Sequence, residues 1–142
     1  MIQVAKKVFS VSFEDKGDYI HIMVEGEGTL ANSMLIHNEV MQLLKNTDKK
    51  YALIDITRLV GRLSMADSIR RAEAIPLEIR GKMVRTAMLE SRENTDFAYK
   101  EEMAMVNRGA KMKLFFELEK AIEWLLEDEH VRKSHAVKIN SR

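Results

Sequence analysis

The stretch that decides the fold is GAKMKLFFELEKAIEWLL, residues 109–126, because its apolar residues change spacing partway along it. Residues 111–116 form a short apolar run typical of a buried strand. From residue 118 onward the apolar side chains recur with the period of a helix that has one buried face, at Leu118, Ala121, Ile122, Leu125 and Leu126. A strand that leads directly into a helix predicts an α/β fold.

The N-terminal part of the chain predicts a hairpin and a central strand. Residues 8–13 and 19–25 both alternate apolar and polar side chains, which is the pattern of half-buried strands. Residues 15–18, DKGD, supply turn chemistry between them. Residues 51–56, YALIDI, are almost all apolar, and this composition indicates a strand that is buried on both faces at the centre of the sheet.

Helix signals separate the later strands. Thr29 has the residue type of a helix cap, and the buried face of the helix after it is predicted at Leu30, Met34, His37, Met41 and Leu44. Ser64, with Asp67 three residues later, has the spacing of a capping box and predicts a second helix start.

The C-terminal half predicts one more strand and helix before the final unit. Residues 82–89 are typical of a strand, and Asn94 or Thr95 is expected to cap a helix that runs to about Arg108. Gly109 can adopt the left-handed conformation that ends helices.

The resulting order, β-β-α-β-α-β-α-β-α, predicts an α/β fold in which a single domain contains a mixed five-stranded sheet and about four helices. We expect this domain to span residues 1–129. Residues 130–142 contain four basic residues and no acid, so we expect a basic, mobile C-terminal tail there.

The composition narrows the classes of function. The 142 residues include 23 lysines and arginines against 22 aspartates and glutamates, so net charge does not steer the molecule toward nucleic acid or anionic lipid. Cysteine is absent, which excludes disulfides, thiolate nucleophiles and cysteine-ligated metal clusters. No apolar run has the length of a membrane span or the form of a cleaved leader. We therefore expect a cytoplasmic protein.

No motif indicates catalysis. The chain has no nucleophile elbow, P-loop or glycine-rich dinucleotide fingerprint, and its four histidines lack the spacing of a zinc-binding helix. His37, on an apolar stripe, is better explained as a packed, hydrogen-bonded histidine than as a base. Asp55 is better explained as a loop cap than as a catalytic carboxylate. We expect no enzyme activity, no cofactor and no metal.

Charge is segregated along the chain although the total is balanced. Residues 58–85 hold seven basic and three acidic side chains, whereas residues 90–129 hold eleven acids and six bases. An anionic partner or ligand near the second helix is one interpretation. Solvated helix faces are the other interpretation, and it is favoured. Aromatic residues do not alternate with these arginines, so a groove for single-stranded nucleic acid is not expected.

Three segments carry a resemblance to a known family. They are the strand YALIDI with its aspartate, the segment NRGAKMKLFF, and the final spacing of Phe115, Ala121, Trp124 and Leu125. In these segments the chain resembles the bacterial SpoIIAA-like family, whose fold is shared with STAS domains and, more distantly, with Sec14-type lipid-binding domains. The similarity runs over about residues 8–126, and most of it lies in packing positions.

The resemblance also implies a site. In STAS antagonists of anti-sigma factors, a strand that ends in an aspartate precedes an Asp-Ser-Ser-Gly segment at a helix start, where one serine is phosphorylated. Asp55 matches the strand aspartate, and Ser64 retains a hydroxyl at the helix start. The motif's neighbouring aspartate, serine and glycine are missing, although Asp67 and Ser68 lie one turn further on.

A phosphate on Ser64 would meet a helix N-terminus and a group of nearby cations, namely Arg58, Arg62, Arg70 and Arg71. The other interpretation is that Ser64 is only a helix cap, and this interpretation is favoured. The candidate regulatory or anion-binding residues are therefore Ser64, Asp55, Ser68 and these four arginines.

The ten methionines have two explanations. Soft side chains fill irregular gaps in a core, and this is the stronger explanation. They can also line an adaptable apolar pocket between the sheet and the helices, which would allow a Sec14-like use of the fold.

The sequence thus predicts a non-enzymatic regulatory or protein-interaction module of SpoIIAA-like, STAS-related type, with Ser64 as a candidate control point. The alternative is Sec14-like binding of an apolar or amphipathic small molecule, and an enzyme ranks third. The partner is an unidentified protein or apolar ligand rather than nucleic acid. Exposed apolar strand or helix surface could also support a homodimer.

Overall fold

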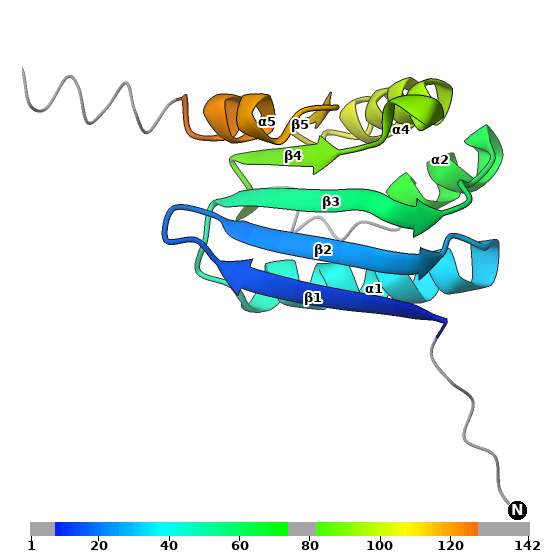
Figure 1. Cartoon of the computed structure of the whole chain (residues 1–142), viewed down its shortest axis with the longest axis horizontal. Coiled ribbons are helices and arrows are strands. Elements are labelled where there is room, and N and C mark those ends of the chain that lie inside the picture. Colours follow the sequence, from blue (N-terminus) through cyan, green and yellow to red (C-terminus); the bar gives the residue numbers. More distant parts are fainter. Residues whose placement is uncertain (1–7, 74–81, 128–142) are drawn as a thin grey trace, which may run out of the picture.

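The computed structural model describes residues 8–73 and 82–127 of the chain (Figure 1). The predicted tail at residues 130–142 lies outside the described residues, and the expected domain limit at residue 129 stays a prediction. In chain order the elements are β1 (Phe9–Asp15), β2 (Ile20–Glu27), α1 (Leu30–Asn46), β3 (Tyr51–Val60), α2 (Met65–Glu73), β4 (Arg85–Leu89), the 3-10 turn η1 (Arg92–Asn94), α4 (Thr95–Val106), β5 (Met112–Phe115) and α5 (Leu118–Leu125).

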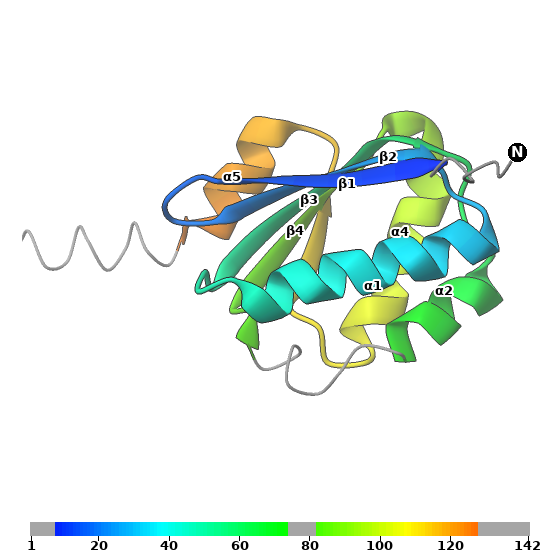
Figure 2. The ribbon, with the colours of Figure 1, turned by 90° about the horizontal axis from the view of Figure 1, so that it is seen from below.

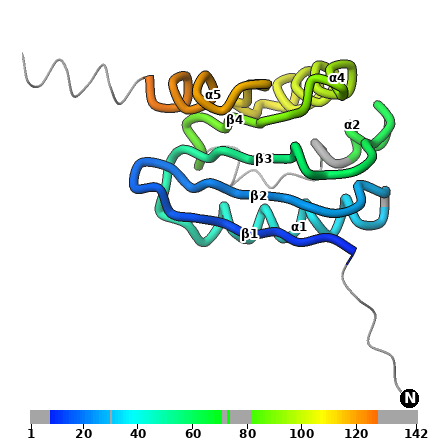
Figure 3. Tube along the Cα trace, viewed as in Figure 1, coloured from blue at the N-terminus to red at the C-terminus, as the bar shows by residue number. Residues whose placement is uncertain are grey.

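The five strands form one mixed sheet in the order β1-β2-β3-β4-β5. β1 and β2 are the antiparallel hairpin that the sequence predicted, and the strands from β2 to β5 run parallel. The tube in Figure 3 shows how α1 connects β2 to β3 and α4 connects β4 to β5. The predicted α/β fold with a mixed five-stranded sheet is therefore confirmed.

β3 lies in the middle of the sheet, as its apolar composition predicted. Its residues Tyr51, Ala52, Leu53 and Ile54 are all buried. A parallel strand that has neighbours on both sides and helices on both faces has no wet surface, so apolar side chains are favourable throughout. Alternate side chains of β3 accordingly enter two separate cores.

The helices form two layers of unequal size. α1, α2 and α4 lie on one face of the sheet, and α5 lies on the other (Figure 2). Ile22, Ile36 and Ile54 belong to the larger core on the α1 face, whereas Leu53 and Leu125 belong to the smaller core under α5. No helix within residues 8–73 and 82–127 combines the length and the apolar composition needed to cross a bilayer.

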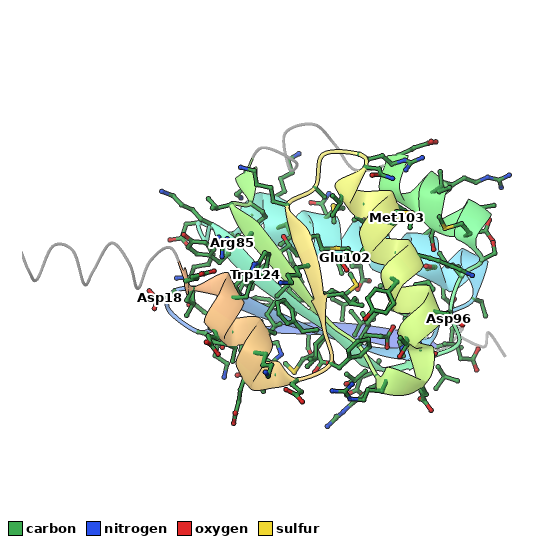
Figure 4. All side chains as sticks on the ribbon, turned by 90° about the horizontal axis from the view of Figure 1, so that it is seen from above. Asp18, Arg85, Asp96, Glu102, Met103 and Trp124 are labelled. Carbon is green, nitrogen blue, oxygen red and sulfur yellow. The ribbon has the colours of Figure 1, made fainter. Side chains whose placement is uncertain are left out.

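Arg85, the first residue of β4, packs against α5 and bonds to it. Its guanidinium lies 4.9 Å from the centre of the Trp124 ring and donates to the Trp124 carbonyl at 2.6 Å. Figure 4 shows these two residues where β4 meets α5. The rings of Phe115 and Trp124 are 5.5 Å apart. The C-terminal spacing that carried the family resemblance is therefore a packing motif.

Two helix boundaries follow local signals that the sequence predicted, whereas Asn94 precedes α4 without a side-chain hydrogen bond that caps it. Thr29 Oγ1 accepts a hydrogen bond from the Asn32 N–H at 3.3 Å, which confirms the start of α1. Gly109 has a φ of +89°, which confirms the left-handed residue predicted after α4. The predicted buried face of α1 is only partly right, because the buried side chains described there are Ser33, Ile36, His37, Val40 and Leu44.

β4 begins at Arg85, later than the predicted strand at residues 82–89. Lys82 instead contacts the C-terminal end of α1, because its Nζ donates to the carbonyls of Leu44 at 2.6 Å and Lys45 at 2.7 Å. Carbonyls in the last turn of a helix lack partners within the helix, so an ammonium group there satisfies them.

Candidate functional site

The predicted site residues gather where β3 leaves the sheet and the chain turns into α2. We call residues 55–70 the β3–α2 corner. β3 ends at Val60, α2 begins at Met65, and Gly61 between them has a φ of +85°, a conformation that favours glycine. The Gly28 N–H donates to the Val60 carbonyl at 2.6 Å, so the loop before α1 supports this corner.

Asp55 lies inside β3 and not at its end. β3 continues to Val60, so the predicted strand end near residue 56 is wrong. Asp55 Oδ1 accepts hydrogen bonds from the Thr57 N–H at 2.9 Å and from Thr57 Oγ1 at 2.7 Å. These bonds give the carboxylate a local structural role close to the favoured interpretation as a cap.

A β-bulge explains why the strand continues past Asp55. The register of β3 against β2 shifts, because Met23 pairs with Asp55 but Glu25 pairs with Arg58. The two paired positions are two residues apart on β2 and three residues apart on β3. β3 therefore contains one extra residue between them. The bond from the Thr57 N–H to Asp55 closes the bulge. Pairing with β2 then resumes and carries the chain to the corner.

Arg62 forms a buried ion pair with Glu90. Arg62 Nε donates to Glu90 Oε2 at 2.8 Å, and Arg62 Nη2 donates to Glu90 Oε1 at 2.6 Å, so the contact is bidentate. The two side chains are 7% and 0% exposed. Arg62 follows β3 and Glu90 follows β4, so the pair joins the carboxyl ends of two neighbouring parallel strands.

The other donors of Arg62 are also occupied. Nη1 donates to the carbonyls of Leu59 and Gly61, and Nη2 also donates to the carbonyl of Ile56 at 2.9 Å. A guanidinium has five N–H groups, and this set of acceptors uses all of them. Arg62 therefore leaves the predicted set of anion donors, because no N–H remains for a phosphate.

Glu90 is a site residue that the sequence did not predict. Its Oε1 also accepts the Ser91 N–H at 2.8 Å and lies 3.5 Å from Asn94 Nδ2. These contacts compensate the cost of burying a carboxylate. The one sequence feature that could have indicated Glu90 is its place directly after an apolar strand, but most acidic residues in such positions are solvated.

Ser64 is exposed at the N-terminus of α2, where the capping-box spacing predicted a helix start. Its Oγ accepts the Asp67 N–H at 3.3 Å, and its carbonyl accepts the Ser68 N–H at 2.9 Å. The hydroxyl therefore caps α2, which is the favoured interpretation. A role for Ser64 in regulation stays a prediction.

Ser68 does not share this accessibility. Its side chain is 1% exposed, and it lies on α2, which packs against α4 and α1. A kinase cannot reach a hydroxyl that is enclosed in this way, so Ser68 leaves the set of candidate modification sites. The side chain of Arg71 lies outside what the structure describes.

Arg58 and Arg70 are predicted cations that remain exposed. Arg58 contacts Glu25 at 2.8 Å, and Arg70 lies 3.8 Å from Asp67. The hydrogen bond to Glu25 raises the pKa of Arg58. The side chains of Arg58 and Arg70 are 78% and 75% exposed, and surface pairs of this kind are weak enough to be exchanged for another anion.

The corner also exposes apolar surface next to Ser64. Val60, the last residue of β3, is 72% exposed. Leu63 and Met65, on either side of Ser64, are partly exposed. The surface thus combines apolar contact area, a hydroxyl at a helix start and exchangeable cations, which suits contact with another protein.

His37 and Glu101 line one cavity of about 70 Å³ between α1, α4 and the sheet. Both side chains are buried, as is that of Ser33. This location supports the interpretation of His37 as a packed core residue. Glu101 was not predicted, although its neighbours Ala98 and Ala104 on the buried face of α4 offered a signal.

Methionines make up half of the lining of a second cavity of about 60 Å³, and they are Met41, Met83, Met88, Met105 and Met112. Sites for drug-sized ligands have volumes of about 300–1,000 Å³, so these two cavities are several-fold smaller. The methionines thus act mainly as core packing. Within residues 8–73 and 82–127, no group of three or more His, Cys, Asp or Glu side chains is placed to hold a metal ion.

No protein-family model and no curated protein sequence matches this chain. Solved structures do match it. An uncharacterized protein from the DUF3478 family with a SpoIIAA-like fold, from Shewanella loihica PV-4, is 20% identical with a TM-score of 0.56, over 88% of this chain and 99% of that one. An anti-sigma factor antagonist from Mycobacterium paratuberculosis is 12% identical with a TM-score of 0.55, over 82% of this chain and 93% of that one.

The class defined by these comparisons is the SpoIIAA-like fold, shared with an anti-sigma factor antagonist. The fold that the family resemblance implied is therefore confirmed. At these identities the likeness establishes the architecture alone, and function must be argued from the surface of this chain.

Proposed function

We propose that this protein is a non-enzymatic regulatory module that binds another protein through the β3–α2 corner, with Ser64 as its point of control. One observation carries the proposal. The Ser64 hydroxyl caps α2 from an exposed position, and apolar surface at Val60 lies at the end of the adjoining strand. The corner can therefore offer both contact area and a modifiable group.

Phosphate on Ser64 would change the charge of this surface without opposing the helix. The N-terminus of α2 tolerates negative charge because of its free N–H groups and its dipole. Asp67 and Arg70, on α2, lie three and six residues after Ser64. The weak contact of 3.8 Å between Arg70 and Asp67 leaves the arginine able to pair with a phosphate instead.

The test is affinity capture with purified full-length chain, in which retained proteins are identified and quantified by mass spectrometry. Ser64→Glu adds charge at the corner, and we expect it to lose the partners that wild type retains. Ser64→Ala removes the cap without adding charge, and we expect it to keep them. Cross-links in the retained complexes are expected within the β3–α2 corner.

Leu118→Glu is the matched control. Leu118 is the first residue of α5 and is 43% exposed, so the added charge again lies at a helix N-terminus, but on the other face of the sheet. We expect Leu118→Glu to bind like wild type. Binding by Ser64→Glu that equals wild type would defeat the switch, and equal losses in Ser64→Glu and Leu118→Glu would indicate general destabilisation instead.

The alternative function, Sec14-like binding of an apolar or amphipathic molecule, has less support. The cavities of about 60 and 70 Å³ share Met41, Ile54, Met88 and Met105, so they adjoin each other, but both are small. A lipid-sized ligand would need the sheet and α1 to move apart. A cytoplasmic location stays a prediction from the sequence.

A further inference from the structure

α1 packs against β1 at one edge of the sheet (Figures 1 and 2), and two adjoining surface grooves lie between them. Their volumes are about 310 and 370 Å³, and both are lined by Phe13, Leu43 and Asn46. Ligand sites have volumes of about 300–1,000 Å³, so each groove is large enough to be a site. The lining includes no residue of the β3–α2 corner, so an occupant here is separate from the partner proposed for the corner.

Part of the groove lining is apolar. The apolar side chains come from the β1–β2 hairpin and from α1, and they are Val11, Phe13, Ile20 and Leu43. Phe13 is 55% exposed although it is a large aromatic residue. An apolar group of a ligand that covers this ring removes apolar surface of both molecules from water, which favours binding.

Three carboxamide side chains form a row on α1 beside this apolar lining. Asn38, Gln42 and Asn46 follow one another at intervals of four residues, so they share one face of the helix. All three are exposed and line the grooves. Within residues 8–73 and 82–127, none of these three side chains makes a hydrogen bond. Each carboxamide therefore offers two N–H donors and one oxygen acceptor to a ligand.

The spacing of the row matches the repeat of an extended polypeptide. Four residues of an α-helix rise about 6 Å, and two residues of an extended chain rise about 6.6 Å. Successive carboxamides of α1 can therefore meet alternate residues of a peptide, and each can donate to a main-chain carbonyl and accept from a main-chain N–H. From Asn38 to Asn46 the row is about 12 Å long, which suits an extended segment better than a compact small molecule.

The charges in the grooves favour a cationic occupant. Lys49 Nζ lies 3.1 Å from Asp15 Oδ1 and 3.8 Å from Asp48 Oδ1, so one ammonium group lies between two carboxylates. Glu39 adds a third carboxylate to the lining, whereas Lys49 is its one lysine and no arginine contributes. The lining therefore carries net negative charge, which a lysine or arginine of a bound segment would complement.

We propose that these grooves bind an extended peptide segment of another protein. The carboxamides of α1 bond to the main chain of the segment, and an apolar side chain of the segment covers Phe13 and Leu43. A lysine or arginine of the segment lies beside Asp15 and Asp48. Bonds to the main chain provide affinity for many sequences, whereas the apolar contact and the carboxylates select segments that combine an apolar and a basic residue.

The first test is selection from a display library of random decapeptides on immobilised full-length chain. We expect the enriched peptides to contain a lysine or arginine and apolar residues at alternate positions, which is the spacing of an extended chain. The same selection on the Phe13→Lys chain should not enrich them. A library that yields no enriched peptide, or only acidic peptides, would overturn the proposal. Apolar residues at helical spacing in the enriched peptides would overturn the extended conformation.

Fluorescence anisotropy with a labelled synthetic copy of the most enriched peptide tests the apolar contact. Met103→Lys is the matched control for Phe13→Lys, because Met103 is 54% exposed against 55% for Phe13 and lies on α4 (Figure 4). We expect Met103→Lys to bind like wild type, and Phe13→Lys to bind roughly tenfold or more weakly, which corresponds to ~1.4 kcal/mol. Equal affinities of Phe13→Lys and wild type would place the peptide elsewhere.

The same assay tests the charge assignment with Asp15→Asn. Asp96→Asn is the matched control, because Asp96 is an exposed aspartate on α4 (Figure 4). We expect Asp15→Asn to bind the peptide roughly threefold more weakly at low salt, and Asp96→Asn to bind it like wild type. A second peptide, in which methionine replaces the basic residue, should bind Asp15→Asn and wild type alike. Equal losses for both peptides would contradict a cation beside Asp15.

NMR of the side-chain amide groups locates the bound peptide. We expect the amide resonances of Asn38, Gln42 and Asn46 to shift when the peptide is added, and those of Asn94 and Asn107, which do not line the grooves, to stay. Gln42→Leu removes the middle carboxamide and should weaken binding while the protein stays folded.

Two NMR or sedimentation results would assign the grooves differently. Shifts confined to the β3–α2 corner would move the peptide to that corner and overturn the proposal while leaving the proposed function intact. A wild-type chain that dimerises by sedimentation, and loses the dimer in Phe13→Lys but not in Met103→Lys, would assign the grooves to a second copy and contradict binding of another protein's segment.

Discussion

Arg62 connects separate parts of the chain through one side chain. Its guanidinium bonds to Glu90 after β4 and to the carbonyls of Ile56, Leu59 and Gly61 near the end of β3. The guanidinium also lies 5.8 Å from the centre of the Phe97 ring on α4. The residue that the sequence offered as an anion donor is therefore the residue that holds the corner in shape.

Substitution of Arg62 or of Glu90 by an uncharged residue should leave the other member of the ion pair as an uncompensated buried charge. We expect Arg62→Met and Glu90→Gln each to lower the free energy of unfolding by about 3–5 kcal/mol in denaturant titrations. Arg58→Met is the matched control, because its pair with Glu25 is exposed, and we expect its free energy of unfolding to stay close to that of wild type. A loss below ~1 kcal/mol for Arg62→Met would show that the ion pair does not stabilise the corner.

Asp15 makes the β1–β2 turn sensitive to acid. Its Oδ1 accepts the Gly17 N–H at 2.8 Å, and this bond, together with Lys49, lowers the pKa of the carboxyl below its ordinary value of 3.8. Because this pKa is lowered, the ionised Asp15 carboxylate stabilises the folded protein at pH values above the unfolded-state pKa. This stabilisation is lost as the pH falls through the folded-state pKa. We expect the Gly17 amide resonance to titrate below about pH 3.8.

Asp15→Asn provides the control for this titration, since its amide oxygen can still accept the Gly17 N–H but does not ionise. We expect its Gly17 resonance to be flat over the same range. A Gly17 titration that is unchanged in Asp15→Asn would exclude this carboxyl as the cause.

The loop before α1 and the loop before α2 cross in direct contact. A Cβ atom on Gly28 would lie 2.5 Å from the Gly61 carbonyl oxygen, which is closer than real Cβ atoms approach backbone atoms. The Gly28 N–H bonds to the Val60 carbonyl across the same crossing. The start of α1 therefore fixes the position of the β3–α2 corner.

Gly28→Ala should separate these loops. We expect it to lower the free energy of unfolding by about 1–3 kcal/mol, the usual cost of overpacking. Gly109→Asn is the comparison, because Gly109 has no atom within 4 Å of an added Cβ and asparagine tolerates its positive φ. Thermal unfolding of both variants gives the result, and equal stabilities of Gly28→Ala and wild type would contradict the crossing.

Helices and strands could be predicted where their formation depends on residues that are close in the sequence. The apolar run YALIDI indicated the central strand, and Thr29, Ser64 and Gly109 marked helix boundaries through local hydrogen bonds and local backbone conformation. Asp55 was misplaced because the bulge that extends β3 depends on pairing with β2. The local sequence pattern of a strand does not show which strand it pairs with or in which register.

The candidate site was predicted less completely, since it depends on contacts between distant residues. Arg62 and Glu90 are 28 positions apart, and nothing near either one indicates the other. Ser68 is also a serine and lies only four residues after Ser64, but the packing of α2 against α4 buries only Ser68. The exposure of Ser64, by contrast, followed from its place at a helix start.

Native mass spectrometry of full-length chain taken directly from cells reports subunit number, bound molecules and phosphate in one spectrum. We predict chains that carry phosphate on Ser64 in part of the population, unphosphorylated chains in complex with another protein, and no retained apolar small molecule. A spectrum in which the chain retains such a molecule, with neither phosphate nor a protein partner, would contradict the assignment as a regulatory module.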